Sequence, residues 1–479
     1  MKKITKLIPV LKIVGFLIIF GIVLGTILSV LNYTDTGGGT GFERFYNLPK
    51  NSADAIFFGS SHCHCTVDQR ILWDKYGIAG VTFSAGSQTL DHTESFVEIA
   101  LSEQNPKLIA VEVYGILFED VSPDYVGVYR SLIGRKWTPG YFMRAWDIAD
   151  SMDASFDQRF ELLTKFPLFH GRYSELTKDD FETELPFLMG YRGSYETVSF
   201  DKPPVSEWNG VEQIPERFFS IINQIKDYAD SKGVEVLFWA APFVITREQQ
   251  EKLNAFAEYA DSKGWSFIDY NRKTDELGID FSSEFRDEEH LNNYGAAKVT
   301  DSLGQYIKEN YTIEDHSGES KYDKWNDNSR YLNNLDFVHN LESDLDFNTY
   351  MTLALQLEEG YSVGIITEGN FGVFPKIYGT ALQNLGLSEE DFFEGGFFFI
   401  ESGVLTKHFK GDYDECIPTL NSEIHVDSKY SQYIIDGTAY DIPDDGIGVF
   451  VYDNKIGCPV DLRYVDVYYV GNMVSHFEE

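Results

Sequence analysis

Short apolar runs that alternate with amphipathic stretches dominate the chain from residue 54 to about residue 310. The predicted strands are Ala55–Phe58, Gly80–Phe83, Leu108–Val113, Val234–Trp239 and Ser266–Ile268. Helical spacing of apolar residues lies between them, as in residues 89–102 and 247–262. Strands that alternate with helices are joined by right-handed crossovers, which favours a parallel sheet covered on both faces. Region 51–312 is therefore predicted to be an α/β domain whose site lies at the carboxyl ends of its strands.

Residues 120–215 interrupt this alternation with a largely helical pattern that is rich in aromatic side chains. One interpretation is a cap over the active site, in which some of the aromatic rings form a platform for sugars. The other interpretation is a structural insertion whose aromatic side chains form a small core of their own. Both stay open at the level of the sequence.

The pattern changes again after residue 312. Residues 313–335 are polar and acidic, and we predict a linker there. Period-two alternation then predicts strands at Tyr350–Leu357, Tyr361–Thr367, Phe397–Glu401, Glu423–Val426, Gly448–Tyr452 and Val460–Val470. One helix, near residues 379–387, breaks the series. Region 336–479 is therefore predicted to be a mainly β accessory domain.

The N-terminal region has the pattern of a membrane anchor. Basic residues at positions 2, 3, 6 and 12 precede an uncharged stretch from Ile13 to Leu31. A helix over such a stretch spans about 29 Å, close to the thickness of the hydrocarbon core of a bilayer. We predict a cytoplasmic tail at 1–12, a transmembrane helix at 13–32 and a glycine-rich tether at 33–50, with the rest of the chain extracytoplasmic. The alternative is a cleaved signal peptide, whose apolar region is typically shorter and ends in small residues.

Composition narrows the choice of partners. The formal net charge is −37, from 39 basic and 76 acidic residues. This excludes nucleic-acid binding, which depends on Lys and Arg neutralising phosphates, and it disfavours a surface that lies along anionic lipid. Four cysteines are too few for a disulfide scaffold, but Cys416 and Cys458 both lie on the extracytoplasmic side, where we hypothesise a disulfide between them.

Two short motifs carry candidate chemistry. Ser61 follows the first predicted strand, where backbone N–H groups at the start of a helix can stabilise an oxyanion. Asp287 and His290 follow the fifth predicted strand. A neutral imidazole can take the serine proton, and the carboxylate can hold the ring in the required tautomer. Each motif alone is weak, but together at the ends of the first and last strands they predict a serine nucleophile.

With these motifs, region 50–310 resembles the SGNH/GDSL hydrolase superfamily. More closely, it is similar to the membrane-anchored bacterial branch near the D-alanyl-lipoteichoic acid transfer protein and the polysaccharide O-acetylation proteins. The resemblance implies a flavodoxin-like α/β/α sandwich with a five-stranded parallel sheet. It also implies that Ser61 is the nucleophile, His290 the general base and Asp287 its orienting acid, and that the N–H groups of Ser61 and Gly86 hold the oxyanion.

The chain departs from the pattern of this superfamily at two places. Ser60 stands where an Asp usually precedes the nucleophile. The sequence Val113-Tyr114-Gly115-Ile116 stands where a G-x-N-D block is expected, so an asparagine donor to the oxyanion is missing there. These departures are compatible with acyl transfer and with a specialised hydrolase.

Other polar residues near the motifs have two interpretations each. His62, Gln88 and Tyr114 either line the substrate pocket or serve packing and turn formation. The run His62-Cys63-His64-Cys65 invites a metal site, but four adjacent residues cannot all point at one ion, and zinc ligands are spaced differently. We therefore predict neither a metal nor another cofactor.

The expected function is that of an esterase or O-acyltransferase which acts through an acyl-serine on acyl groups of cell-wall or exported polysaccharide. Its expected partners are the bilayer, an acylated glycan or acyl-carrier substrate, and a membrane-bound O-acyltransferase. The alternative is a catalytically idle scaffold of the same fold that binds glycans or proteins at the cell surface. The C-terminal region, through residues 445–453 and 460–467, resembles the domain of interleukin-like inducers of epithelial–mesenchymal transition, and no site residues follow from that.

Overall fold

The fold is that of a computed structural model, which divides into two compact units. One comprises Met1–Phe181 and Phe187–Tyr322, and the other Glu182–Pro186 and Asp323–Glu479. The structure describes residues 15–16, 19–21, 23, 39–117, 132, 135–164, 188–340, 345–355, 357, 360–367, 379–392, 396–420, 423–430, 432–442, 446–466 and 475–476.

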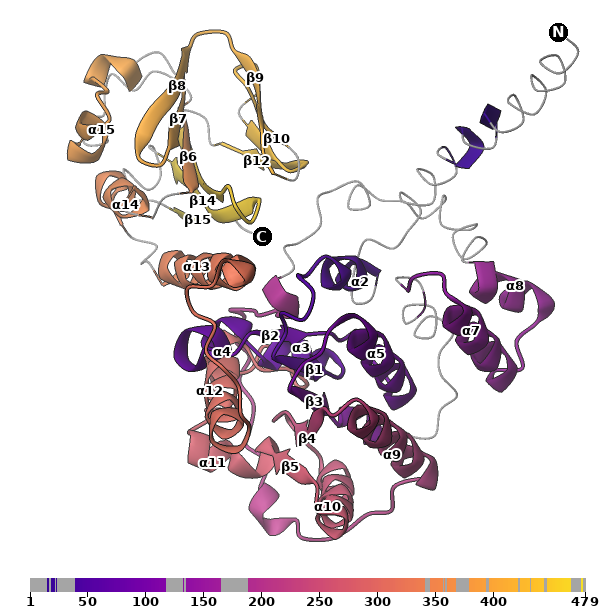
Figure 1. The fold of residues 1–479 in the computed structure, drawn as a ribbon. Coiled ribbons are helices and arrows are strands. Elements are labelled where there is room, and N and C mark those ends of the chain that lie inside the picture. The colour runs from indigo at the N-terminus through magenta and orange to yellow at the C-terminus, as the bar shows by residue number, and fades with distance from the viewer. Residues whose placement is uncertain are drawn as a thin grey trace, which may run out of the picture. The chain divides into compact units, whose positions relative to one another are not determined.

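A five-stranded parallel sheet forms the centre of the first unit (Figure 1). Its strands are β1 (Ala55–Phe58), β2 (Gly80–Thr82), β3 (Leu108–Glu112), β4 (Glu235–Ala240) and β5 (Ser266–Asp269). They lie in the order β2-β1-β3-β4-β5, and each neighbouring pair is parallel. β1, β2 and β3 are buried along their whole length, which explains why their sequences are nearly continuous apolar runs. The predicted parallel sheet is confirmed, and its strand order is the flavodoxin-like one.

Helices cover both faces of this sheet. They are α3 (Ser61–Thr66), α4 (Gln69–Tyr76), α5 (Leu90–Glu103), α9 (Glu216–Ser231), α10 (Arg247–Lys263), α11 (Thr274–Leu277) and α12 (Asn293–Asn310). α12 packs against α4 and α3, whereas α5 packs against α9. Figure 1 shows these two groups on opposite sides of the strands.

The segment before β1 differs from the predicted tether. Residues Gly39–Tyr46 form helix α2, and its Phe42 and Phe45 are fully buried. The Phe45 ring stacks on Phe83 at 4.3 Å between ring centroids, and the Phe42 ring meets Phe96 at 4.9 Å. Two aromatic residues three positions apart lie on one face of a helix, so this glycine-containing stretch folds onto the domain.

The predicted membrane segment 13–32 lies mostly outside the described residues, and the predicted tail 1–12 lies wholly outside them. Within the described part of the chain, no helix combines the length and the apolar character needed to cross a membrane. The anchor thus stays a prediction.

The aromatic-rich interruption contains a helical hairpin in its described part, formed by α7 (Pro139–Ser151) and α8 (Phe156–Thr164). The hairpin has a small core of its own, made of Leu132, Tyr141, Ala145, Ala149, Ala154 and Leu162. Only some of its aromatic residues contribute to this core, because Trp146 and Phe156 are among those that stay exposed.

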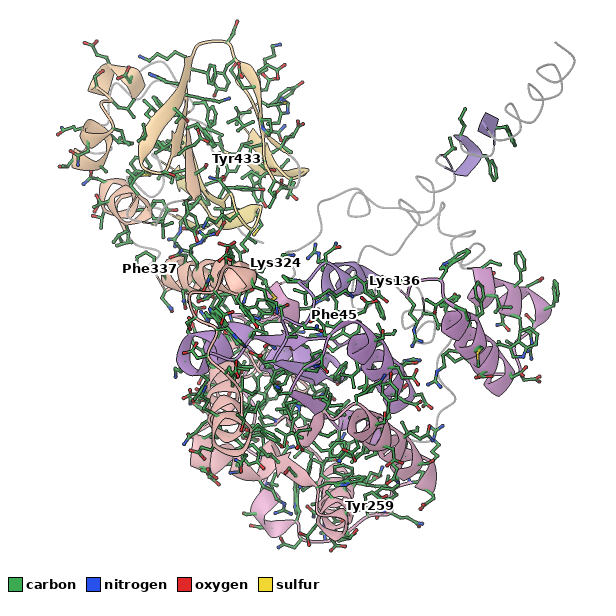
Figure 2. The ribbon with its side chains drawn as sticks, in the orientation of Figure 1. Phe45, Lys136, Tyr259, Lys324, Phe337 and Tyr433 are labelled. Atoms are coloured by element: carbon green, nitrogen blue, oxygen red, sulfur yellow. The ribbon has the colours of Figure 1, made fainter. Side chains whose placement is uncertain are left out.

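The second unit is mainly β, as predicted. One antiparallel sheet has the order β15-β14-β13-β6-β7-β8, and the other has the order β12-β11-β10-β9. The strands are β6 (Tyr361–Thr367), β7 (Gly396–Glu401), β8 (Val404–Lys410), β9 (Asp414–Pro418), β10 (Glu423–Asp427), β11 (Gln432–Ile435), β12 (Thr438–Asp441), β13 (Gly446–Asp453), β14 (Cys458–Asp466) and β15 (Ser475–His476). Side chains from both sheets meet in one core, where the rings of Tyr433, labelled in Figure 2, and Phe450 lie 5.4 Å apart.

Two sequence predictions for this unit are wrong in part. Residues 350–357 were predicted as a strand, but Phe347–Ala354 form helix α14, in which the Asp346 side chain caps the Thr349 N–H. The predicted linker 313–335 contains the boundary between the units, yet from Asp323 onward its residues belong to helix α13 (Asp323–His339). In both helices the buried residues recur at helical spacing, which the polar composition of α13 obscured. The remaining helix, α15, spans Thr380–Asn384.

The hypothesised disulfide does not form in the structure, because Cys416 and Cys458 are both free. Cys416 is exposed on β9 of the four-stranded sheet, whereas Cys458 begins β14 of the six-stranded sheet and hydrogen-bonds with Tyr331. The two cysteines belong to different sheets of the unit.

Candidate active site

The turn after β1 presents Ser61 as the first residue of α3. Ser60 caps this helix: its Oγ accepts the His62 N–H, and its carbonyl accepts the Cys63 N–H at 3.0 Å. Ser60 is buried, and its hydroxyl donates to Glu112 Oε2 at 3.3 Å. Ser61 is only partly buried. Of the two adjacent serines, Ser61 is therefore the one that a substrate can reach.

The structure brings the three predicted catalytic residues together. The Ser61 Oγ lies 2.7 Å from the His290 Nε2. The other ring nitrogen, Nδ1, lies 2.8 Å from Asp287 Oδ1 and 3.0 Å from Oδ2. Because a carboxylate accepts, His290 carries its proton on Nδ1 and leaves the Nε2 lone pair free to take the serine proton.

Hydrogen bonds hold Asp287 in its ionised form. Burial by itself raises the pKa of Asp287, but hydrogen bonds from the His290 ring and the Glu289 N–H lower it overall. Asp287 Oδ1, which accepts the Glu289 N–H, also accepts the backbone N–H of His290 at 2.9 Å. The short segment 287–290 thus fixes both the acid and the ring that it orients.

A second polar link joins the same two segments. His62 Nε2 lies 3.2 Å from Glu289 Oε2, and the Tyr114 hydroxyl donates to that oxygen at 2.7 Å. The His62 and Tyr114 rings stack with 3.8 Å between their centroids. Residues 61 and 62 on α3 therefore pair with residues 290 and 289, and two parallel contacts set the position of the base relative to the nucleophile.

The charges of this second link are settled by burial and hydrogen bonding. Burial lowers the pKa of His62, so the ring is neutral near pH 7 and donates its Nε2 proton. The hydrogen bonds from His62 and Tyr114 lower the pKa of Glu289, which is therefore ionised. His62 and Tyr114 thus lie beside the candidate site and support Glu289, and their predicted role in lining a substrate pocket stays a prediction. The sequence interpretation missed Glu289, although it lies next to His290.

Glu112, also missed from the sequence, supports the turn that carries the nucleophile. It lies at the end of β3, is 2% exposed, and accepts the Tyr114 N–H at 2.6 Å in addition to the Ser60 hydroxyl. Burial raises the pKa of Glu112 to about 8. Gly59 makes room for this carboxylate, since a Cβ at residue 59 would stand 2.6 Å from the Glu112 Cβ.

The predicted oxyanion donors lie at the ends of neighbouring strands. Within the described part of the chain the Ser61 N–H has no acceptor, as is usual for the first residue of a helix. Gly86 lies in the turn after β2, the strand next to β1, and the space where its Cβ would stand is open to 4 Å. Gln88 is buried and donates to Thr93 Oγ1 of α5 at 2.9 Å, which favours the packing interpretation for this residue.

Comparisons with known proteins add little to this geometry. No family model matches the chain, and no curated protein is similar to it. Among solved structures, the chain is similar to a candidate acylhydrolase from Bacteroides fragilis, with 13% identity and a TM-score of 0.30. The similarity covers 56% of this chain and 93% of the other. A TM-score of this size has no weight for fold or function.

Histidines and cysteines of α3 make contacts of other kinds in the structure. The His64 Nδ1 lies 2.9 Å from the Ser84 hydroxyl, and burial raises the pKa of the Cys63 and Cys65 thiols, so both stay protonated. Zinc binds the thiolate form. Within the described residues, no group of three or more His, Cys, Asp or Glu side chains could hold a metal ion.

Proposed function

We propose that this chain is a serine esterase or O-acyltransferase that works through an acyl-serine intermediate. The observation that carries this proposal is the 2.7 Å contact between Ser61 Oγ and His290 Nε2, with Asp287 on the opposite ring nitrogen. The same three positions match the SGNH pattern noted in the sequence.

The chemistry follows from the hydrogen bonds. The Ser61 Oγ bonds to the carbonyl carbon of an ester while its proton passes to His290 Nε2. The carbonyl oxygen becomes an oxyanion next to the Ser61 and Gly86 N–H groups. Breaking the ester C–O bond releases an alkoxide, which takes the proton back from His290. Water or a sugar hydroxyl then gives its proton to His290 and attacks the acyl-serine, which restores the Ser61 hydroxyl.

The proposed setting is the extracytoplasmic face of a bacterial membrane, with residues 13–32 as the anchor. The proposed substrates are acyl groups of cell-wall or exported polysaccharide, delivered from a glycan ester or an acyl carrier, and a membrane-bound O-acyltransferase is the proposed partner. The support for this setting is the order of basic and apolar residues at the N-terminus and the family resemblance.

A labelling experiment tests the nucleophile. The purified full chain is treated with a fluorophosphonate probe, the modified residue is located by tandem mass spectrometry, and hydrolysis of an aryl acetate is measured in parallel. We expect modification at Ser61 and loss of at least about 10³-fold in turnover for Ser61→Ala. Ser262→Ala, at an exposed serine on α10, is the matched control and keeps full activity.

Two outcomes would contradict the proposal. Turnover that Ser61→Ala leaves unchanged would remove Ser61 as nucleophile. A folded wild-type chain with neither turnover nor labelling would favour the idle scaffold, which the missing asparagine donor also favours.

A further inference from the structure

The α7–α8 hairpin displays more large apolar side chains than its own core uses. The aromatic face consists of Trp137, Phe142, Met143, Trp146, Phe156 and Phe160. Met143 is 68% exposed and Phe156 is 82% exposed. Elsewhere in the described part of this unit, exposed apolar residues gather within 16–23, in the predicted membrane segment, whereas Val198 and Val211 stand singly. Apolar side chains that gather on one face of a soluble domain mark a surface which another phase or molecule covers.

The spacing of these residues gives each helix a second apolar face. On α7, Phe142 and Met143 each lie about one turn before Trp146, whereas Tyr141, Ala145 and Ala149 point into the hairpin core. On α8, Phe156 and Phe160 are also one turn apart, and Leu162 is in the core. The hairpin is thus apolar on two sides, and its core buries only one of them.

The start of the hairpin contacts α2, the helix that follows the predicted anchor in the sequence. The Lys136 ammonium group lies 3.9 Å from the centre of the Tyr46 ring, at the end of α2. Lys136 and Lys50 both pair with Glu103 at the end of α5. Figure 2 labels Lys136 and Phe45 at this corner of the unit. Trp137, the first residue of the aromatic face, directly follows this residue that contacts α2.

Only residues 33–38 separate α2 from the end of the predicted membrane segment. Six residues reach at most about 20 Å when fully extended. If residues 13–32 span the bilayer, α2 and the start of α7 are held close to the surface of the membrane.

The composition of the face fits a lipid interface. Trp and Phe side chains favour the boundary between headgroups and acyl chains. The charged residues of the hairpin do not form a basic cluster, because Arg144 and Arg159 pair with Glu94 and Asp150. The binding would thus depend on apolar insertion and not on attraction to anionic headgroups.

We propose that the aromatic face of the α7–α8 hairpin inserts into the interface of the lipid bilayer that anchors the chain. This rests on the membrane anchor of the proposed function. The hairpin then acts as a second contact with the membrane and limits the orientations of the α/β unit.

The test measures lipid contact directly at Met143. The full chain with Cys416→Ser and Met143→Cys carries an environment-sensitive dye at residue 143 and is placed singly in phosphatidylcholine nanodiscs. Some of the nanodiscs contain lipid with a nitroxide quencher near the headgroup. We expect a shift of dye emission to shorter wavelength and strong loss of emission with the quencher lipid. Ser262→Cys, exposed on α10, is the matched control and should show neither change.

The experiment distinguishes failure of the proposed membrane contact from failure of the predicted anchor. A dye at Val23→Cys, read with quencher lipid whose nitroxide lies near the end of the acyl chain, reports on the middle of the predicted span. Quenching at residue 23 without quenching at residue 143 overturns the docking of the face and leaves the anchor intact. Absence of quenching at both positions overturns both. Emission at residue 143 that is shifted but insensitive to quencher lipid means that protein covers the face, which also overturns the proposal.

Discussion

Glu289 has an oriented carboxylate because two donors share one of its oxygens. His62 and Tyr114 both donate to Oε2, and the backbone of Glu289 continues directly into His290. A contact that fixes residue 289 also fixes the approach of the neighbouring imidazole to Ser61. Hydrogen bonds to a charged partner are worth about 1.5–3 kcal/mol, so this link is strong enough to restrict the loop.

Replacing Glu289 by Gln should therefore lower kcat about tenfold with little change in KM, because small displacements of a base slow proton transfer. The measurement is steady-state hydrolysis of an aryl acetate. Glu288→Gln is the matched control, since Glu288 is exposed and one residue away. Equal effects of the two substitutions would show that general charge, and not the link to His62 and Tyr114, is responsible.

The raised pKa of Glu112 predicts that the free energy of unfolding depends on pH. Its pKa is raised from 4.5 to about 8 by burial. A group whose pKa is raised in the folded state stabilises the fold fully at pH values below its unfolded pKa. This stabilisation is lost as the pH rises through the pKa of the folded state. Between pH 6 and pH 9 this loss amounts to about 2.7 kcal/mol.

Glu112→Gln cannot ionise, so its stability relative to the wild type should improve as the pH rises across that window. Hydrogen exchange of the amides in β1 and β3, compared between the two proteins at each pH, measures the difference. A constant offset across the whole range would mean that Glu112 does not titrate there.

Single residues were predictable from the sequence only where a motif contains them. Ser61, Asp287 and His290 follow strands and form a known pattern of chemistry, and the structure places them within hydrogen-bonding distance. Glu112 and Glu289 belong to no such pattern. Their roles depend on side chains brought together from β3, α3 and the segment before α12, and the sequence shows no sign of those contacts.

Among the secondary-structure elements, the five parallel strands were the easiest to predict, since burial on both faces makes each a continuous apolar run. Amphipathic elements were harder. Residues 350–357 alternate well enough to suggest a strand, but the Asp346 cap starts a helix. In α2, the glycines at positions 39 and 41 suggested a tether, and the burial of Phe42 and Phe45 outweighs their cost in a helix.

Phe45→Ala tests whether α2 belongs to the folded unit. Loss of a stacked, fully buried ring should weaken the docking of this helix by about 3 kcal/mol. Hydrogen exchange of residues 39–46 should accelerate, with the amides of α10 as an internal reference. Fast exchange of these amides already in the wild type would show instead that the segment is a tether.

At the scale of the whole molecule, the sequence predicted two units and the region of their boundary. The boundary falls after Tyr322, inside the predicted linker, but helix α13 begins immediately at Asp323. The change from a parallel to an antiparallel sheet was visible where one face of a strand is less buried, as in β10, because β6 and β13 are buried on both faces. That Cys416 and Cys458 stay unpaired was not predictable, because pairing depends on which sheet holds each cysteine.

Thiol labelling tests whether the cysteines of the second unit are free. In the native full chain without reductant, a maleimide should modify Cys416, which is exposed, and leave the buried Cys63 and Cys65 unmodified. Unfolding should expose all four. A cross-linked peptide containing Cys416 and Cys458 in a non-reducing digest would contradict the structure.

The nucleophile and its base stand 229 residues apart in the chain. Ribosomes add about 5–20 residues per second, so roughly 10–50 s pass between the synthesis of Ser61 and that of His290. A serine without its base is a weak nucleophile. A growing chain therefore carries a weakly nucleophilic serine, and reactivity begins only once nearly all of the first unit has been made.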